Sequence, residues 1–163
     1  MDCDILLLNG PSSSGKSSIA REIQKRLACS GIDAAVISID DYMRISTNEP
    51  IWEDDVFEIM PDLCRGLTGA LRQGRLAIVD HVITSARIYE ALLEAAAGDR
   101  LKPVRVQCSA ALLKQREAAR GDRFAGSAEA SLRYLYPQSG YDLCVDSGKA
   151  TPAEIAARLM ALL

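Results

Sequence analysis

Several features that point to particular protein classes are missing from this sequence of 163 residues. The longest apolar stretch falls far short of the roughly 18 residues that span a bilayer, and the N-terminus lacks the basic region of a secretory signal. The formal net charge of −3 provides no general attraction to nucleic acid or to an anionic membrane. We therefore expect a cytoplasmic protein with no membrane partner, and nucleic acid is a disfavoured partner.

The cysteines also lack a recognisable pattern. There are five, an odd number, and no two of them form a C-x-x-C pair, which argues against a disulfide framework or a zinc site. Cys3, Cys108 and Cys144 each lie in or beside an expected strand, so we predict that they are buried. Buried free thiols are typical of a reducing compartment, in agreement with the cytoplasmic location.

The chain contains no repeat, low-complexity segment or linker, so we expect a single domain over residues 1–163. Short segments that are apolar on both faces alternate with helical ones, which is typical of a parallel sheet covered by helices. The expected strands are 4–8, 34–38, 76–80, 104–107 and 143–145. The expected helices are 16–29, 54–73, 85–97, 110–119, 128–134 and 152–162. This alternation predicts a three-layer α/β domain with a five-stranded parallel sheet, whose ligands bind at the carboxyl ends of the strands.

The most informative segment is Gly10-Pro11-Ser12-Ser13-Ser14-Gly15-Lys16-Ser17, which matches the phosphate-binding pattern G-x-x-x-x-G-K-[ST]. It stands between an expected strand and an expected helix, where the loop N–H groups can wrap a phosphate. We predict that Lys16 reaches the β- and γ-phosphates and that the Ser17 hydroxyl holds Mg²⁺. Ser18 completes the predicted nucleotide-binding set. The segment therefore predicts a nucleoside triphosphate ligand.

Two carboxylates, Asp40 and Asp41, follow the second expected strand. A phosphotransferase that acts on a hydroxyl needs a group to orient the nucleophile and accept its proton, and we choose Asp40 as this base. Asp41 then either contacts the substrate or a metal, or caps a helix. The alternative for both residues is that they only cap a short helix.

Acidic and aromatic side chains near the third strand complete the expected acceptor side. Asp80 ends that strand and is predicted to hold Mg²⁺, directly or through water. His81 is the only histidine, has no second His or Cys nearby, and is expected to be structural or to line the substrate site. Trp52, the only tryptophan, either stacks on a ligand or packs in the core.

Residues of about 120–135 are expected to form a lid. Gly121 and Gly126 bracket a mobile segment that can close over the triphosphate, and Arg120 and Arg123 offer forked donors to phosphate oxygens. Arg123 is also placed to stabilise charge in the transition state. The alternative is a solvated helix end with internal Arg–Asp pairs. The loop 146–151, after the fifth strand, is expected to border the adenine.

These blocks together resemble the chloramphenicol phosphotransferase-like family of P-loop kinases. The resemblance lies in the opening through Ser17, in Ile39-Asp40, in Ile78-Val79-Asp80 and, most specifically, in Ala119-Arg120-Gly121-Asp122-Arg123 with Ala125-Gly126. It implies a P-loop kinase fold with an Arg-bearing lid and ATP-dependent, Mg²⁺-assisted phosphoryl transfer to a hydroxyl of a small molecule. Asp40 takes the place of the family's base, and the loop with Arg120 and Arg123 takes the nucleotide role. The sequence departs from the family pattern at residues 41–43, at His81 and over residues 44–75, so the acceptor stays open.

Two other functions remain as alternatives. The same scaffold can phosphorylate a nucleoside, a nucleotide or a polynucleotide 5′-hydroxyl, although a polynucleotide favours a basic channel and residues 53–55 are acidic. A nucleotide-binding regulatory switch is the third possibility, and the sequence contains no N-K-x-D guanine-recognition string. The oligomeric state is left open.

Overall fold

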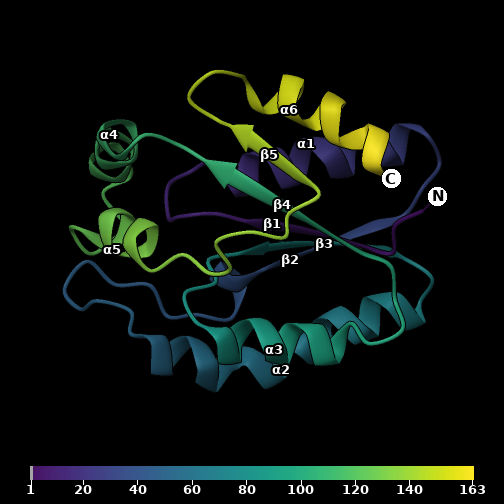
Figure 1. Ribbon diagram of the computed structural model, residues 1–163, viewed down its shortest axis with the longest axis horizontal. Coiled ribbons are helices and arrows are strands. Elements are labelled where there is room, and N and C mark those ends of the chain that lie inside the picture. The colour runs from purple at the N-terminus through teal and green to yellow at the C-terminus, as the bar shows by residue number, and fades with distance from the viewer. Residues whose placement is uncertain (1) are drawn as a thin grey trace.

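The computed structural model describes residues 2–163, and a parallel sheet of five strands in the order β2-β3-β1-β4-β5 forms its centre (Figure 1). The strands are β1 (Ile5–Asn9), β2 (Ala34–Ser38), β3 (Leu76–His81), β4 (Leu101–Gln107) and β5 (Leu143–Asp146). Each corresponds to a predicted strand, and the parallel α/β architecture is confirmed. The largest difference is that β4 begins at Leu101, three residues before its predicted start.

The early start of β4 has a simple cause. Residues 101–103 contain Pro103, which lacks a backbone N–H and argues against a strand when the sequence is considered alone. In the structure this end of β4 pairs with β1, and β5 pairs with β4 only from Val104 onward. Pro103 therefore precedes the stretch of β4 that pairs with a strand on each side, and a strand tolerates proline at such a margin.

Helices cover both faces of the sheet and make three layers (Figure 1). The helices are α1 (Lys16–Cys29), α2 (Glu53–Arg72), α3 (Ala86–Ala95), α4 (Ala110–Arg120), α5 (Ser127–Arg133) and α6 (Pro152–Leu159), with short 3₁₀ turns at Ile39–Asp41 and Met160–Leu162. Helices α1 and α6 pack on one face and α2 and α3 on the other. Helices α4 and α5 lie together beside the ends of the strands, outside these layers (Figure 1).

The alternation of side chains along β1 divides the core into two parts. Leu6 and Leu8 pack toward α1 and α6, whereas Ile5 and Leu7 pack toward α2 and α3. All residues of β1 and β3 are buried, because both strands have a neighbour on each side and helices on each face. Double coverage explains why these strands are continuous apolar runs rather than alternating ones.

The free cysteines only partly follow the predicted burial. Cys3 and Cys108 are buried, as expected, but Cys144 is exposed. The prediction for Cys144 was wrong because β5 is the last strand of the sheet, which leaves part of its surface uncovered. None of the helices within residues 2–163 combines the length and apolar character needed to cross a membrane.

Candidate active site

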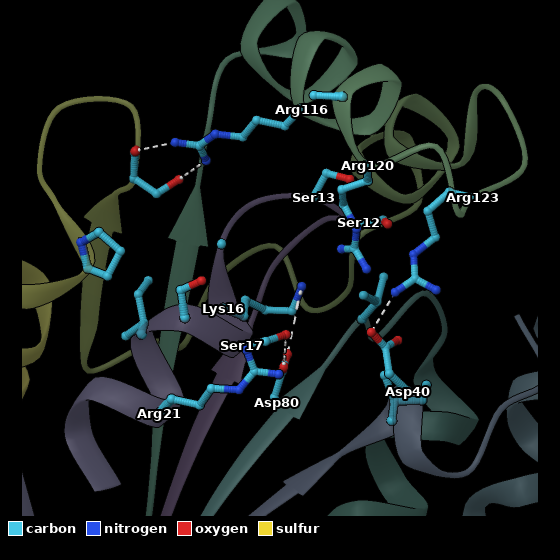
Figure 2. A pocket seen from close by; sticks show the side chains of 18 residues that line it. Ser12, Ser13, Lys16, Ser17, Arg21, Asp40, Asp80, Arg116, Arg120 and Arg123 are labelled. Carbon is cyan, nitrogen blue, oxygen red and sulfur yellow. Dashed lines mark hydrogen bonds and ion pairs between the residues drawn. The ribbon is translucent and has the colours of Figure 1, made fainter. Parts of the chain in front are cut away.

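A cavity of about 580 Å³ lies at the carboxyl ends of the strands (Figure 2). Its charged walls are Lys16, Arg21, Asp40, Asp80, Arg116, Arg120 and Arg123. The remaining walls include Ser12, Ser13, Gly15, Ser17, Ser18, Val82, Ser147 and Pro152. Five cationic side chains against two carboxylates favour an anionic ligand, even though the whole chain is negatively charged.

The loop between β1 and α1 has the shape of a phosphate cradle. A Cβ at Gly10 would lie 2.3 Å from the Val106 carbonyl oxygen, so only glycine allows this close approach. Gly15 has a φ of 90° and begins α1, and Ser13 has a φ of 64°, which is uncommon outside glycine. Left-handed residues at alternate positions of the loop turn its backbone N–H groups into one concavity, which binds anions.

The predicted loop residues divide into a lining set and a supporting set. Ser12, Ser13, Gly15, Lys16, Ser17 and Ser18 line the cavity, whereas Gly10, Pro11 and Ser14 do not. The hydroxyl groups of Ser13 and Ser14 are buried and have no hydrogen-bond partner among residues 2–163. The loop therefore keeps polar groups that its own fold does not satisfy, and a bound phosphate is one way to satisfy those that face the cavity.

Lys16, Ser17 and Asp80 form the floor of the cavity. The Lys16 ammonium donates to the Pro11 carbonyl at 2.9 Å and lies 4.0 Å from the Asp80 carboxylate. The Ser17 hydroxyl donates to the same carboxylate at 2.6 Å. Burial lowers the pKa of Lys16, and the negative charge of Asp80 opposes this effect. The hydroxyl and carboxylate oxygens are hard ligands of the kind that Mg²⁺ takes together with phosphate oxygens, so these residues fit that ion.

Asp40 and Arg123 meet across the cavity although 83 positions separate them in the sequence (Figure 2). Asp40 lies in the 3₁₀ turn after β2, and its carboxylate accepts from the Arg123 guanidinium at 2.5 Å. The Arg123 side chain is only 6% exposed, and its Nη1 has no hydrogen-bond partner within the described chain. Arg123 thus binds Asp40 through Nη2, and its Nη1 remains available as a donor to a ligand.

Asp41 behaves differently from its neighbour. Both residues are exposed, but Asp40 lines the cavity and Asp41 does not. Both carboxylates lie within the turn, and no side chain caps this turn at its N-terminus. The structure therefore contradicts the interpretation that Asp40 and Asp41 only cap a short helix, and it separates the two residues by their surroundings.

Arg120 and Arg116 extend from α4 toward the phosphate-binding loop (Figure 2). Arg120 lines the cavity and pairs with Asp122 at 3.1 Å, so an internal Arg–Asp pair of the kind considered for this segment does form. Arg116 was missed by the sequence analysis. Its guanidinium donates to the Ser147 carbonyl at 2.8 Å and to the Ser14 carbonyl at 3.4 Å.

Arg116 therefore joins three segments that are distant in the sequence: α4, the phosphate-binding loop and the loop after β5. A sequence signal for it exists, because Arg116 stands one helical turn before Arg120 and such residues share a helix face. The same spacing signals Arg21, which follows Ser17 by four residues and also lines the cavity. Ser147 and Pro152 border the cavity as well, in the loop expected near the adenine.

Two predicted acceptor-side residues need correction. His81 is fully buried, does not line the cavity, and contacts the Met60 sulfur at 3.4 Å. Burial lowers the pKa of His81 to about 4, so the ring is neutral and structural, and a substrate-lining role is wrong. Trp52 is 68% exposed, which contradicts core packing. Its backbone N–H is held by Asp55 at 2.7 Å just before α2, and ligand stacking stays a prediction.

Polar contacts hold the phosphate-binding loop from behind. Asn9 is buried at the end of β1, donates to the Tyr136 carbonyl at 2.7 Å and accepts from the Ile83 N–H at 3.0 Å. The Ser12 N–H donates to the Ser131 hydroxyl of α5 at 2.9 Å. The loop is thus fixed to the segment after β3 and to α5, which preorganises its N–H groups.

A phosphate-binding loop after the first of five parallel strands, with acidic residues at the ends of β2 and β3, defines a P-loop kinase fold. The chain belongs to the chloramphenicol phosphotransferase-like protein family, which it matches over residues 3–163. No curated protein sequence matches the chain.

Solved structures resemble this fold over nearly the whole chain. The Mycobacterium tuberculosis APS kinase CysC in complex with AMPPNP and APS is 19% identical with a TM-score of 0.78, over 98% of this chain and 96% of that one. A Sinorhizobium meliloti gluconokinase is 22% identical with a TM-score of 0.73, over 96% and 89%. A Deinococcus radiodurans tunicamycin resistance protein is 18% identical with a TM-score of 0.67, over 98% and 95%. These likenesses establish the kinase-type fold.

Proposed function

We propose that this protein transfers the γ-phosphoryl group of ATP to a hydroxyl group of a small molecule. The carrying observation is that a carboxylate and a guanidinium, Asp40 and Arg123, meet at 2.5 Å over the cavity that the phosphate-binding loop lines. A proton acceptor and a phosphate-binding cation are the two groups that such a transfer needs opposite the nucleotide. Family membership supports the same reaction class.

In the proposed complex the loop N–H groups and Lys16 hold the phosphates. Ser17 and Asp80 are the residues that would hold Mg²⁺, which neutralises charge on the β- and γ-phosphates when bound. Arg116 and the loop after β5 lie at the other end of the cavity from Asp40 and suit the nucleoside part (Figure 2). We propose further that residues 1–163 act as one cytoplasmic domain with a lid at about 120–135.

The chemical step is assigned to Asp40 and Arg123. Asp40 takes the proton of the acceptor hydroxyl. The oxygen of that hydroxyl bonds to the γ-phosphorus, while the bond from the γ-phosphorus to the ADP oxygen breaks. Arg123 and Arg120 stabilise the charge on the transferring group. The small-molecule acceptor is favoured over a polynucleotide because a polynucleotide favours a basic channel, whereas the whole chain has a net charge of −3 and the first turn of α2, residues 53–55, is acidic.

The decisive experiment measures ATP consumption by the purified protein with Mg²⁺ across a panel of hydroxyl compounds. Chloramphenicol, nucleosides, sugars and a 5′-hydroxyl oligonucleotide make up the panel, and mass spectrometry examines the products. We expect one acceptor to gain one phosphoryl group. Tight ATP binding without any phosphorylated product, and with hydrolysis that no acceptor accelerates, would contradict the proposal and favour a regulatory switch.

Replacing the proposed base provides a matched pair of variants. Asp40→Asn is expected to lower the rate on the acceptor by about 10²–10⁴-fold without weakening ATP binding, because general-base assistance is lost. Asp41→Asn removes the same charge from the exposed neighbour and is expected to retain most of the activity. The two rates and the ATP dissociation constants test this. The reverse result would show that Asp41 is the base.

A further inference from the structure

A buried carboxylate that the proposed reaction does not use lies under the lid. Glu117 belongs to α4, is 8% exposed, and stands between the cavity-lining Arg116 and Arg120 in the sequence. Its side chain accepts from the Gly126 N–H at 2.9 Å and from the Ala128 N–H at 2.7 Å. Its own carbonyl accepts from the Gly121 N–H at 3.3 Å.

These contacts place Glu117 at both ends of one loop. The loop begins at Gly121 and ends at Gly126, both with left-handed φ angles of 65° and 92°, and it carries Arg123. Glu117 thus accepts hydrogen bonds at both ends of the loop, through its backbone carbonyl from Gly121 and through its side chain from Gly126. Within the loop, the Phe124 carbonyl accepts from the Ser127 N–H at 3.1 Å and from its hydroxyl at 2.7 Å.

The chemistry of a carboxylate suits this position. Burying a charge is costly unless hydrogen bonds compensate it, and here each carboxylate oxygen has its own N–H donor. Glutamine has the same shape but only one acceptor oxygen, so its NH₂ group would face an N–H donor. An unpaired buried donor costs more than the bond itself contributes. The site therefore selects glutamate over its isostere.

We propose that Glu117 is a positioning residue that clasps the loop 121–126 and thereby holds Arg123 over the cavity; its kinetic consequence rests on the proposed function. Arg120 belongs to α4 rather than to the clasped loop, and Lys16 belongs to α1. Nucleotide binding by these two residues is therefore independent of the clasp. Loss of the clasp acts on the chemical step through Arg123.

Hydrogen–deuterium exchange tests the clasp without any reference to catalysis. Glu117→Gln is expected to speed amide exchange at Gly126 and Ala128 by about tenfold, the change that follows from losing one hydrogen bond of ordinary net strength. Glu129→Gln, which changes an exposed acid on α5, serves as the matched control and leaves these rates unchanged. Unchanged exchange in Glu117→Gln would overturn the proposal.

A double-mutant cycle with Arg123→Ala tests the positioning role. With Mg–ATP and water as the phosphoryl acceptor, or with the acceptor found above, Glu117→Gln is expected to lower kcat about 10- to 100-fold and to leave KM for ATP within about twofold. In the Arg123→Ala background the same change should have no further effect, because it acts through that residue. Additive effects would overturn the positioning role.

One outcome separates the clasp from the proposed function. If Arg123→Ala itself leaves turnover unchanged, the proposed role of Arg123 is wrong, and the exchange rates alone decide whether Glu117 clasps the loop.

Should Glu117→Gln fail to fold, as judged by circular dichroism, Gly126→Ala replaces it. Its φ of 92° is strained for alanine, so it displaces the loop exit from the other side. It is expected to give the same exchange and kcat changes, and wild-type values would overturn the proposal.

Discussion

Lys16 shows how two opposing effects act on a single side chain. Its ammonium group is buried, and burial lowers its pKa, while Asp80 at 4.0 Å favours the charged form. Each group thus depends on the other, because a buried charge without a partner is costly. In the proposed complex the same pair would supply a cation for phosphate and an oxygen ligand for Mg²⁺.

Lys16→Ala is expected to reduce nucleotide-dependent turnover to background, because the positive charge at the β- and γ-phosphates is lost. ATP consumption with Mg²⁺ measures this. Lys25→Ala, which removes a lysine from the exposed side of the same helix, is the control and retains activity. Full activity in Lys16→Ala would contradict the assignment of the phosphate-binding loop.

His81 makes stability depend on pH. Its folded-state pKa of about 4 lies below the ordinary value of 6.5, so the unfolded chain binds more protons between these values. The stabilisation is therefore complete above pH 6.5 and is lost as the pH falls toward 4. Between pH 7 and pH 5 the free energy of unfolding is expected to drop by about 2 kcal/mol on account of this group.

Urea denaturation at the two pH values measures this drop, and His81→Leu provides the comparison. The variant lacks the titrating ring, so its free energy of unfolding should change less over the same range. An equal change in both proteins would show that other groups dominate the acid sensitivity.

At the scale of elements, the site lies at the strand from which the sheet extends in both directions, β1. The chain passes from β1 to β2 and β3 on one side and then to β4 and β5 on the other. The loop after β1 therefore has open space at its carboxyl end, which is where ligands bind in such sheets. Helix α4 and the loop that follows it then bring Arg116, Arg120 and Arg123 over this point from outside the layers (Figure 1).

The first turn of α6 borders this site and is held by a reciprocal cap. The Thr151 hydroxyl accepts from the Glu154 N–H at 3.3 Å, and the Glu154 carboxylate accepts from the Thr151 N–H at 2.8 Å. Thr151→Ala is expected to lower the free energy of unfolding by about 1 kcal/mol. Urea denaturation measures the loss, Thr151→Ser should restore most of it, and equal stability of all three proteins would contradict the importance of the cap.

At the scale of the whole molecule, charge is distributed unevenly. The chain has a net charge of −3, yet its cavity gathers Lys16, Arg21, Arg116, Arg120 and Arg123. Such local focusing favours an anionic ligand at one place without a general affinity for polyanions. Binding there links four of the five strands through the loops that follow them, so it should stabilise the entire domain.

Mg–ATP at about 100 times its dissociation constant is expected to stabilise the fold by about 2.7 kcal/mol. For a domain of this size that corresponds to a rise in Tm of about 5–10 °C. Differential scanning fluorimetry measures the shift, and Lys16→Ala should largely lose it. The absence of a shift in the wild-type protein at saturating nucleotide would contradict ATP binding at this cavity.

Several parts of the fold and site were predictable because their causes are local. The apolar runs that form β1 and β3 are buried on both faces. Gly10 is a fixed position of the phosphate-binding motif, and the close approach of the Val106 carbonyl leaves no room for a side chain there. The carboxyl-end position of Asp80 follows from the end of β3. The exposure of Cys144 was not predictable, because the order of strands in the sheet, and hence which strand lies at an edge, depends on long-range packing.

The sequence alone determined the alternation of elements, the phosphate-binding loop and the family, since each is encoded within short stretches of residues. The tertiary structure decided which charged side chains meet. Asp40 faces Arg123, Arg116 reaches Ser147, and Glu117 reaches Gly126. It also placed Asp40 at the cavity and Asp41 outside it. Such contacts depend on how helices and loops pack around the ends of the strands, and no local pattern of residues records that packing.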